Sequence, residues 1–320
     1  MGSALLSEDV DPPVGRFMTV DGTRLHYVER GTGVPVVLLH GNGSTIADFV
    51  SSGITERVAR GGHRVITFDR PGFGYSDRPR GRTWGPSEQA HLLWRAFALL
   101  GIERPIVVGH SWGTLVALAL ALEGPEKVAG LVLLSGYYYP IPRVPSAFPI
   151  VDAVLWHSVM PFIGRAIALD AVRRIFAPNV VPERFKRDYS IPHALRPSQL
   201  QAVAEEAAML MESAKIFSAF YKELSVPVRL IAGSDDRIVD TAKHSARLHR
   251  ELGTSTFRNV PGSGHMVHHA APEEVVAAIT SMGERGTATR SWTRRNRVPR
   301  HWLHIEENSE ERQRPDMRQH

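Results

Sequence analysis

Short apolar, β-rich runs alternate with helical patterns over most of the chain, and this alternation constrains the fold more than any other feature. The β-rich runs occupy 34–40, 63–69, 105–110, 130–135, 226–233 and 254–260. Their apolar residues are continuous, which is typical of parallel strands buried on both faces. Helical patterns lie at 46–60, 87–100, 112–122, 241–252 and 272–281. The order predicts an α/β fold with a doubly wound, mostly parallel sheet of about eight strands.

Local signals refine the ends of these elements. Residues 17–29 are predicted to form two strands joined at Asp21-Gly22, a pair that favours tight hairpin turns. Ser87 is expected to cap the helix at 87–100, and Pro272 is expected in the first turn of the last helix.

The alternation stops at 136–225, a segment rich in Pro and aromatic residues with helical patterns at 166–176 and 198–221. Because the strand pattern resumes at 226, we interpret this segment as a helical lid inserted after a sheet strand. A separate small domain is the alternative. The core then comprises 15–135 and 226–283, and the polar, Arg-rich segment 284–320 is expected to be a disordered basic tail.

Composition excludes several classes of function. The chain of 320 residues has no cysteine, which excludes disulfides, thiolate metal sites and a Cys nucleophile, and fits a reducing compartment. It has no secretion signal and no apolar run of about 20 residues, so we expect a cytoplasmic protein without a membrane span. The net charge is +5, but nine Arg against six acidic residues lie in 284–320. The basicity therefore belongs largely to the tail, and nucleic-acid binding is not expected.

The stretch Gly109-His-Ser-Trp-Gly113 lies between a predicted strand and a predicted helix. A G-x-S-x-G sequence in this context forms a sharp turn in which side chains at 109 and 113 would collide. The turn would raise the hydroxyl of Ser111 above the sheet as a nucleophile. It would also direct the backbone amide of Trp112 toward an oxyanion, close to the positive end of the helix.

A nucleophilic serine needs a base and an acid that orients the base. His265 follows the run at 254–260, and the candidate acids follow the run at 226–233. We favour Asp236, which fits G-x-x-D followed by an apolar pair, and we expect Asp235 to be a turn residue. The backbone amide of Asn42, in the loop 40–43, is the best candidate for the second oxyanion donor.

The other histidines near these loops are given structural roles. His40 and His110 are expected to brace the loops, whereas His268 and His269 are expected to be packed or solvated.

Taken together, the chain resembles the α/β-hydrolases that carry a lid domain. The matching pieces are HGNG (40–43), DRPGFGYSDRP (69–79), GHSWG (109–113), the acid loop at 233–240 and GSGHMVHHAAPEEV (262–275). They are spread over residues 15–282. The resemblance implies that Asp69 is structural rather than catalytic. Asn42 and Trp112 also resemble the halide-binding pair of haloalkane dehalogenases, but those enzymes use an Asp nucleophile where this chain has Ser111.

The primary hypothesis is a serine hydrolase, independent of cofactors and metals, that cleaves a small or medium apolar ester through an acyl-enzyme. A C–C bond (vinylogous dione) hydrolase with the same triad is one alternative. A ligand-binding or signalling protein on a hydrolase scaffold is another. The aromatic and Met side chains of the predicted lid are candidates either to line an apolar pocket or to pack the lid itself: Tyr137, Tyr138, Tyr139, Trp156, Met160 and Phe162. The natural substrate and the oligomeric state are left open.

Overall fold

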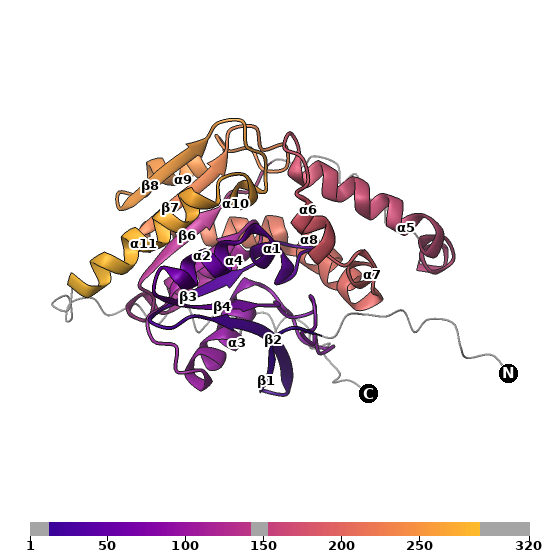
Figure 1. Ribbon diagram of the computed structural model, residues 1–320, viewed down its shortest axis with the longest axis horizontal. Coiled ribbons are helices and arrows are strands. Elements are labelled where there is room, and N and C mark those ends of the chain that lie inside the picture. The colour runs from indigo at the N-terminus through magenta and orange to yellow at the C-terminus, as the bar shows by residue number, and fades with distance from the viewer. Residues whose placement is uncertain (1–12, 142–152, 289–320) are drawn as a thin grey trace, which may run out of the picture. The chain divides into compact units, whose positions relative to one another are not determined.

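The computed structural model describes the backbone of residues 13–141 and 153–288, and the side chains of 13–141 and 164–283 (Figure 1). The expected basic tail lies outside these residues except at its start, where the last helix continues to Ala288. The side chains of Trp156, Met160 and Phe162 also lie outside them.

The strands form one eight-stranded sheet with the order β1-β2-β4-β3-β5-β6-β7-β8. The neighbouring strands in the order β4-β3-β5-β6-β7-β8 are all parallel. Only the pairs β1-β2 and β2-β4 are antiparallel. The predicted fold class is therefore confirmed. The strands are β1 (Arg16–Val20), β2 (Thr23–Arg30), β3 (Val34–Leu39), β4 (His63–Phe68), β5 (Ile106–His110), β6 (Gly130–Leu134), β7 (Val228–Gly233) and β8 (Ser255–Val260).

Helices and connecting turns complete the described chain. The α-helices are α1 (Ala47–Ser52), α2 (Ile54–Arg60), α3 (Pro86–Leu99), α4 (Gly113–Glu123), α5 (Ala153–Phe176), α6 (Glu183–Asp188), α7 (Ile191–Ala194), α8 (Pro197–Ser218), α9 (Ser245–Glu251), α10 (Val267–Ala270) and α11 (Pro272–Ala288). Two short 3₁₀ turns, η1 (Pro125–Lys127) and η2 (Tyr221–Glu223), precede β6 and β7.

Alternate residues of the central strands enter opposite layers of the core. In β3, Val37 and Leu39 belong to the hydrophobic cluster that includes residues of α3, α4 and α9, whereas Val36 and Leu38 belong to the cluster that includes residues of α1, α2, α10 and α11. Helices therefore cover both faces of the sheet (Figure 1). Such double coverage explains why the central strands are apolar at successive positions. The edge strand β8 departs from this expectation because much of it is exposed.

Several predicted helix bounds were wrong. The single helix predicted at 46–60 is divided into α1 and α2, because Gly53, with a φ of 78°, interrupts it. The cap of α3 is Gly85, and Ser87 lies inside the helix because Pro86 occupies its first turn. The helix expected at 241–252 begins only at Ser245.

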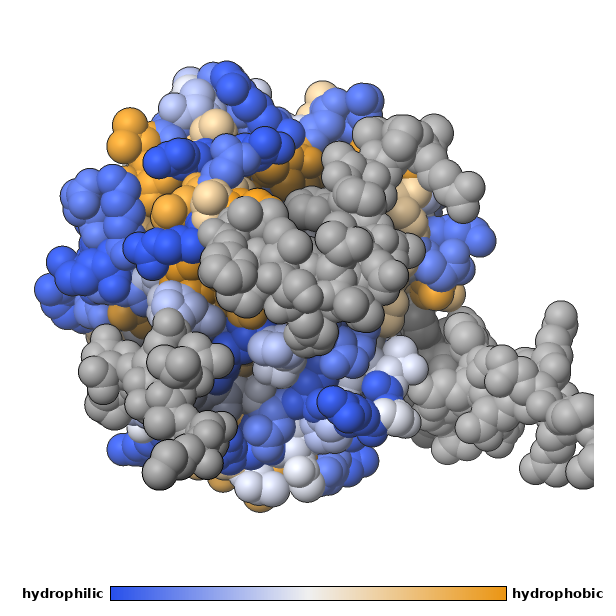
Figure 2. Space-filling view, turned by 90° about the vertical axis from the view of Figure 1, so that its right-hand side faces the viewer, coloured by the Kyte–Doolittle hydropathy of each residue, from blue (hydrophilic) through white to orange (hydrophobic). Residues whose placement is uncertain are grey.

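Helices α5 to α8 are inserted between β6 and β7, where the sequence predicted a helical insertion. A fully buried ion pair ties this insertion to the core: the guanidinium of Arg70 binds the carboxylate of Glu206 on α8. Hydrophobic residues reach the surface beside hydrophilic ones on the face that carries the insertion (Figure 2). The exposed large hydrophobic residues of the insertion include Ile167, Leu169, Val180, Met211 and Ile216. No helix in the described part of the chain combines the length and apolarity that crossing a bilayer requires.

Candidate active site

Ser111 lies at a sharp turn between β5 and α4. Its φ is 51°, a left-handed conformation that costs a non-glycine residue energy. The turn requires glycine on both sides, because a Cβ at Gly109 would collide with the Gly113 carbonyl and one at Gly113 with the Leu39 carbonyl. A hydrogen bond of 2.9 Å from the Ser111 amide to the Leu134 carbonyl fixes the turn to the end of β6. The backbone is thus held in a strained conformation by contacts at its base.

The loops after β7 and β8 bring a carboxylate and an imidazole together. Asp236 Oδ2 lies 2.9 Å from His265 Nδ1, and only 1% and 5% of the two side chains are exposed. The other oxygen, Oδ1, accepts hydrogen bonds from the amides of Ile238 and Val239 at 2.8 and 2.9 Å. Asp235 instead is exposed, and its carboxylate accepts a hydrogen bond from the Ser234 hydroxyl. Of the two candidate acids, Asp236 is therefore the one that contacts His265.

The electrostatics of this pair follow from its burial. Burial lowers the pKa of His265, while Asp236 opposes that shift and His110 adds to it. For Asp236, burial acts to raise the pKa, but the hydrogen bonds from His265 and the two amides outweigh it and lower the pKa. The pair at neutral pH is a carboxylate and a neutral imidazole. Because a carboxylate only accepts, His265 carries its proton on Nδ1 and leaves Nε2 free to accept another.

The loop 40–43 lies directly beside Ser111. An added Cβ at Gly41 would be 3.0 Å from the Cβ of Ser111. The Arg70 guanidinium holds this loop by donating to the carbonyls of His40 and Gly41, at 2.8 and 3.0 Å. The ring of His40 donates to the Gly41 carbonyl and accepts from the Arg70 amide. Burial, helped by the Arg70 charge, lowers the pKa of His40 to about 3, so its ring is a neutral brace, as expected.

The backbone amides of Asn42 and Trp112 have no hydrogen-bond acceptor among the described residues. Their side chains are held differently. The Asn42 amide group donates to the Val203 carbonyl on α8 at 3.1 Å, and its buried Oδ1 has no partner among the described residues. The indole of Trp112 is buried, and its Nε1 likewise has no partner in the described part of the chain.

A buried cluster behind His265 was not predicted as a unit. Asp48 on α1 accepts hydrogen bonds at Oδ1 from His268 and His269, at 2.7 and 3.1 Å, and its Oδ2 lies 3.3 Å from His110 Nδ1. His110 Nε2 in turn contacts the carbonyl oxygen of His265 at 3.2 Å. The cluster therefore contacts the backbone of His265, the candidate base, through His110. The one available signal was the spacing of His268 and His269, one helical turn after His265.

The ligand atoms of Asp48, His110 and His268 converge, which makes them a candidate metal site. The 2.7 Å separation between His268 and Asp48 fits a hydrogen bond. Two ligands sharing a tetrahedral ion at about 2.0–2.1 Å would lie about 3.3 Å apart. We therefore interpret the group as a hydrogen-bonded cluster.

Asp69 organises a turn. Its carboxylate binds His26 Nδ1 at 2.7 Å and accepts from the amides of Ile46 and Tyr75 at 2.8 and 3.0 Å.

The tyrosines that follow β6 are largely part of the packing. Tyr138 is fully buried, and Tyr139 donates from its hydroxyl to Glu251 at 2.8 Å. Tyr137, more exposed, donates to the sulfur of Met211 on α8.

The sheet, the turn at Ser111 and the loops gathered at the carboxyl ends of its strands are the architecture of an α/β-type hydrolase. A model of the alpha/beta hydrolase family matches residues 36–278. The chain belongs to this family.

Known relatives differ in the chemistry that their names describe. The chain is 26% identical over 281 residues to haloalkane dehalogenase 2 of Mycobacterium tuberculosis, covering 84% of this chain and 94% of the relative. A 2-hydroxymuconate semialdehyde hydrolase of Pseudomonas putida is 36% identical over 135 residues, which cover 41% of this chain and 47% of the relative. Among solved structures, a thermophilic esterase from Thermogutta terrifontis matches with a TM-score of 0.67 and 23% identity, covering 85% of this chain and 99% of the esterase. A meta-cleavage product hydrolase from Pseudomonas fluorescens matches with a TM-score of 0.66 and 19% identity, over 85% and 98%.

Proposed function

We propose that this chain is a serine hydrolase that cleaves a small or medium apolar ester through an acyl-enzyme. The observation that carries the proposal is the buried 2.9 Å hydrogen bond between Asp236 and His265. Their loops follow the carboxyl ends of β7 and β8, as the strained Ser111 follows the carboxyl end of β5. Ser111 is the nucleophile, His265 the base and Asp236 the acid that orients the base, and each follows the end of a different strand.

The roles follow from the proton positions. Nε2 of His265 accepts the proton of Ser111 as the Oγ adds to the ester carbonyl, and Asp236 stabilises the imidazolium that forms. The backbone amides of Asn42 and Trp112 donate to the oxyanion. His265 then protonates the departing alcohol, and a water molecule opens the acyl-enzyme by the same steps. No cofactor or metal is needed for these steps.

Residue 111 determines the class of bond that is attacked. Asn42 and Trp112 resemble the halide-binding pair of haloalkane dehalogenases, and haloalkane dehalogenase 2 is among the relatives. A serine displacing halide from an sp³ carbon would form a stable ether, which water does not open. A serine adding to a carbonyl forms an ester that turns over. The serine therefore favours acyl chemistry over dehalogenation.

A C–C bond hydrolase acting on a vinylogous dione is the second candidate. It is favoured by the likeness to the Pseudomonas putida hydrolase and by a triad that serves both reactions. A binding or signalling role on the same scaffold would leave the triad idle. In each case we propose that α5 to α8 form a lid that selects the substrate.

The experiment compares the wild-type chain with Ser111→Ala. A fluorophosphonate probe should label only the wild type, and p-nitrophenyl esters of short and medium chain length should be hydrolysed only by it. Absence of both labelling and Ser111-dependent turnover would remove the ester hypothesis. Turnover of a vinylogous 1,5-dione alone would favour the C–C hydrolase, and saturable binding without turnover would favour a receptor.

A further inference from the structure

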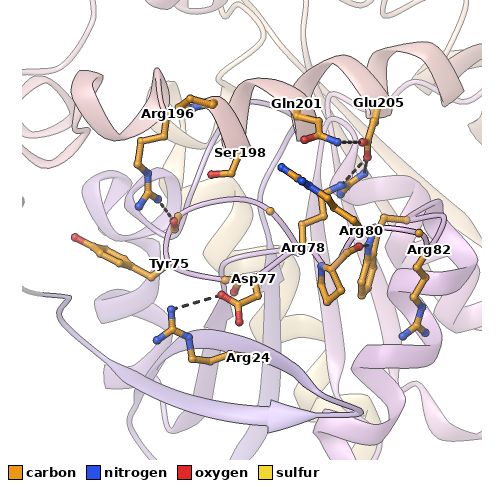
Figure 3. Close-up of a pocket in the computed structure, with 17 residues that line it drawn as sticks. Arg24, Tyr75, Asp77, Arg78, Arg80, Arg82, Arg196, Ser198, Gln201 and Glu205 are labelled. Carbon is orange, nitrogen blue, oxygen red and sulfur yellow. Dashed lines mark hydrogen bonds and ion pairs between the residues drawn. The ribbon is translucent and has the colours of Figure 1, made fainter.

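A hollow of about 980 Å³ lies between the start of α8, the segment 72–84 and β2. We call it the Arg-lined groove (Figure 3). Five arginines line it, against two acidic residues, Asp77 and Glu205. The arginines are Arg24, Arg78, Arg80, Arg82 and Arg196.

The two carboxylates are already paired. Glu205 binds Arg78 through contacts of 2.7 and 2.8 Å, and Asp77 lies 3.5 Å from Arg24. Figure 3 shows the first pair below α8 and the second across the groove from it. Three guanidinium groups therefore remain without a carboxylate among the described residues: those of Arg80, Arg82 and Arg196.

Two of these three are held in place by uncharged partners. The Arg82 guanidinium lies 4.7 Å from the ring centre of Trp84, and that buried indole is itself fixed by a 3.0 Å hydrogen bond to the Pro79 carbonyl. Arg196 donates to the carbonyl of Gly74. Both positions are thus partly ordered before any ligand binds, which reduces the entropy that binding costs.

The N-terminus of α8 adds to the positive potential. This helix has 22 residues, no side-chain cap and no acidic residue in its first turn, and Pro197 and Ser198 line the groove. Within the described part of the chain, no side-chain cap compensates the positive end of this dipole, and the backbone amides of Ser198 and Gln199 have no hydrogen-bond acceptor.

We propose that the Arg-lined groove binds a small ligand carrying two or more phosphate charges, such as a diphosphate group. Guanidinium groups bind phosphate oxygens through two parallel hydrogen bonds, and a helix N-terminus binds the same oxygens through backbone amides. The volume exceeds that of one phosphate and falls within the range of ordinary small-molecule sites. This binding site is additional to the proposed hydrolysis and does not depend on it.

Titration calorimetry of the full-length chain with inorganic pyrophosphate tests the proposal. We expect saturable binding that weakens as KCl is raised, and that is about tenfold weaker in Arg80→Gln/Arg82→Gln. The matched control is Arg30→Gln/Arg104→Gln, which removes the same charge from exposed arginines outside the groove. The control should bind as the wild type does. No saturable binding, or equal weakening in the two double variants, would overturn the proposal.

Ser198→Asp separates binding from folding. An acidic residue in the first turn should preserve or raise the melting temperature, because it complements the helix dipole, yet it should repel pyrophosphate. Unchanged affinity in a variant that melts normally would overturn the placement of the ligand at α8.

Discussion

Replacing Glu206 with Gln tests how the insertion is attached to the core. Both Glu206 and Arg70 have no exposed side-chain surface. Glu206 accepts from both terminal nitrogens of Arg70 and from Gln89 Nε2, the last at 3.0 Å. Glu206→Gln keeps the shape of the side chain but replaces one carboxylate oxygen by an NH₂ group, which would face the N–H donors of Arg70 and Gln89. It also leaves the charge of Arg70 buried without this counter-ion. Breaking a buried pair in this way costs about 3–5 kcal/mol.

The loss should be visible as a lower melting temperature. The 265 residues whose backbone the structure describes, at about 2.1 cal/mol/K each, give an unfolding entropy near 0.6 kcal/mol/K, so the expected decrease is about 5–9 °C. The control is Glu205→Gln, the neighbouring residue of α8, whose partly exposed pair with Arg78 should contribute less than about 1 kcal/mol. Thermal unfolding followed by circular dichroism at one scan rate gives both values. Equal and small decreases in the two variants would refute the buried ion pair as an anchor.

Three further predictions concern the site and pH. Asp236→Asn should lower kcat on p-nitrophenyl esters by about 10⁴-fold, whereas Asp235→Asn should leave kcat close to wild type; the reverse order would show that the acid is misassigned. Because burial lowers the pKa of His265, the acidic limb of kcat/KM should have its midpoint below pH 6.5, and a midpoint above it would contradict a buried base. Burial also lowers the pKa values of His40 and His268 to about 3, below the unfolded value of 6.5. The unfolded chain therefore takes up protons first as pH falls, and the free energy of unfolding should decrease by up to about 1.4 kcal/mol per pH unit for each histidine between pH 6.5 and 3. Urea titrations at pH 5, 6 and 7 measure this slope, and a stability independent of pH would contradict it.

Local patterns were sufficient to predict the sheet. The six predicted runs correspond to β3 to β8, and in β3 to β7 the apolar residues are nearly continuous because both faces of these strands are covered, whereas the edge strand β8 is partly exposed. The short helices α6, α7 and α10 were not predicted, since four to six residues carry too little periodicity to be distinguished from a loop. The start of α3 was misplaced because the fixed φ of Pro86 outweighed the capping preference of Ser87.

By itself the sequence determined the order of strands and helices, the turn at Ser111 and the loops on which Asp236 and His265 lie, because each depends on neighbouring residues. Only the tertiary structure decided which side chains meet: Asp48 with His268, 220 positions later, and Arg70 with Glu206, 136 positions later. It also gathered the five arginines of the groove from β2, the segment 72–84 and the residue before α8. Such contacts arise when helices pack on a sheet, and no local pattern of residues specifies them.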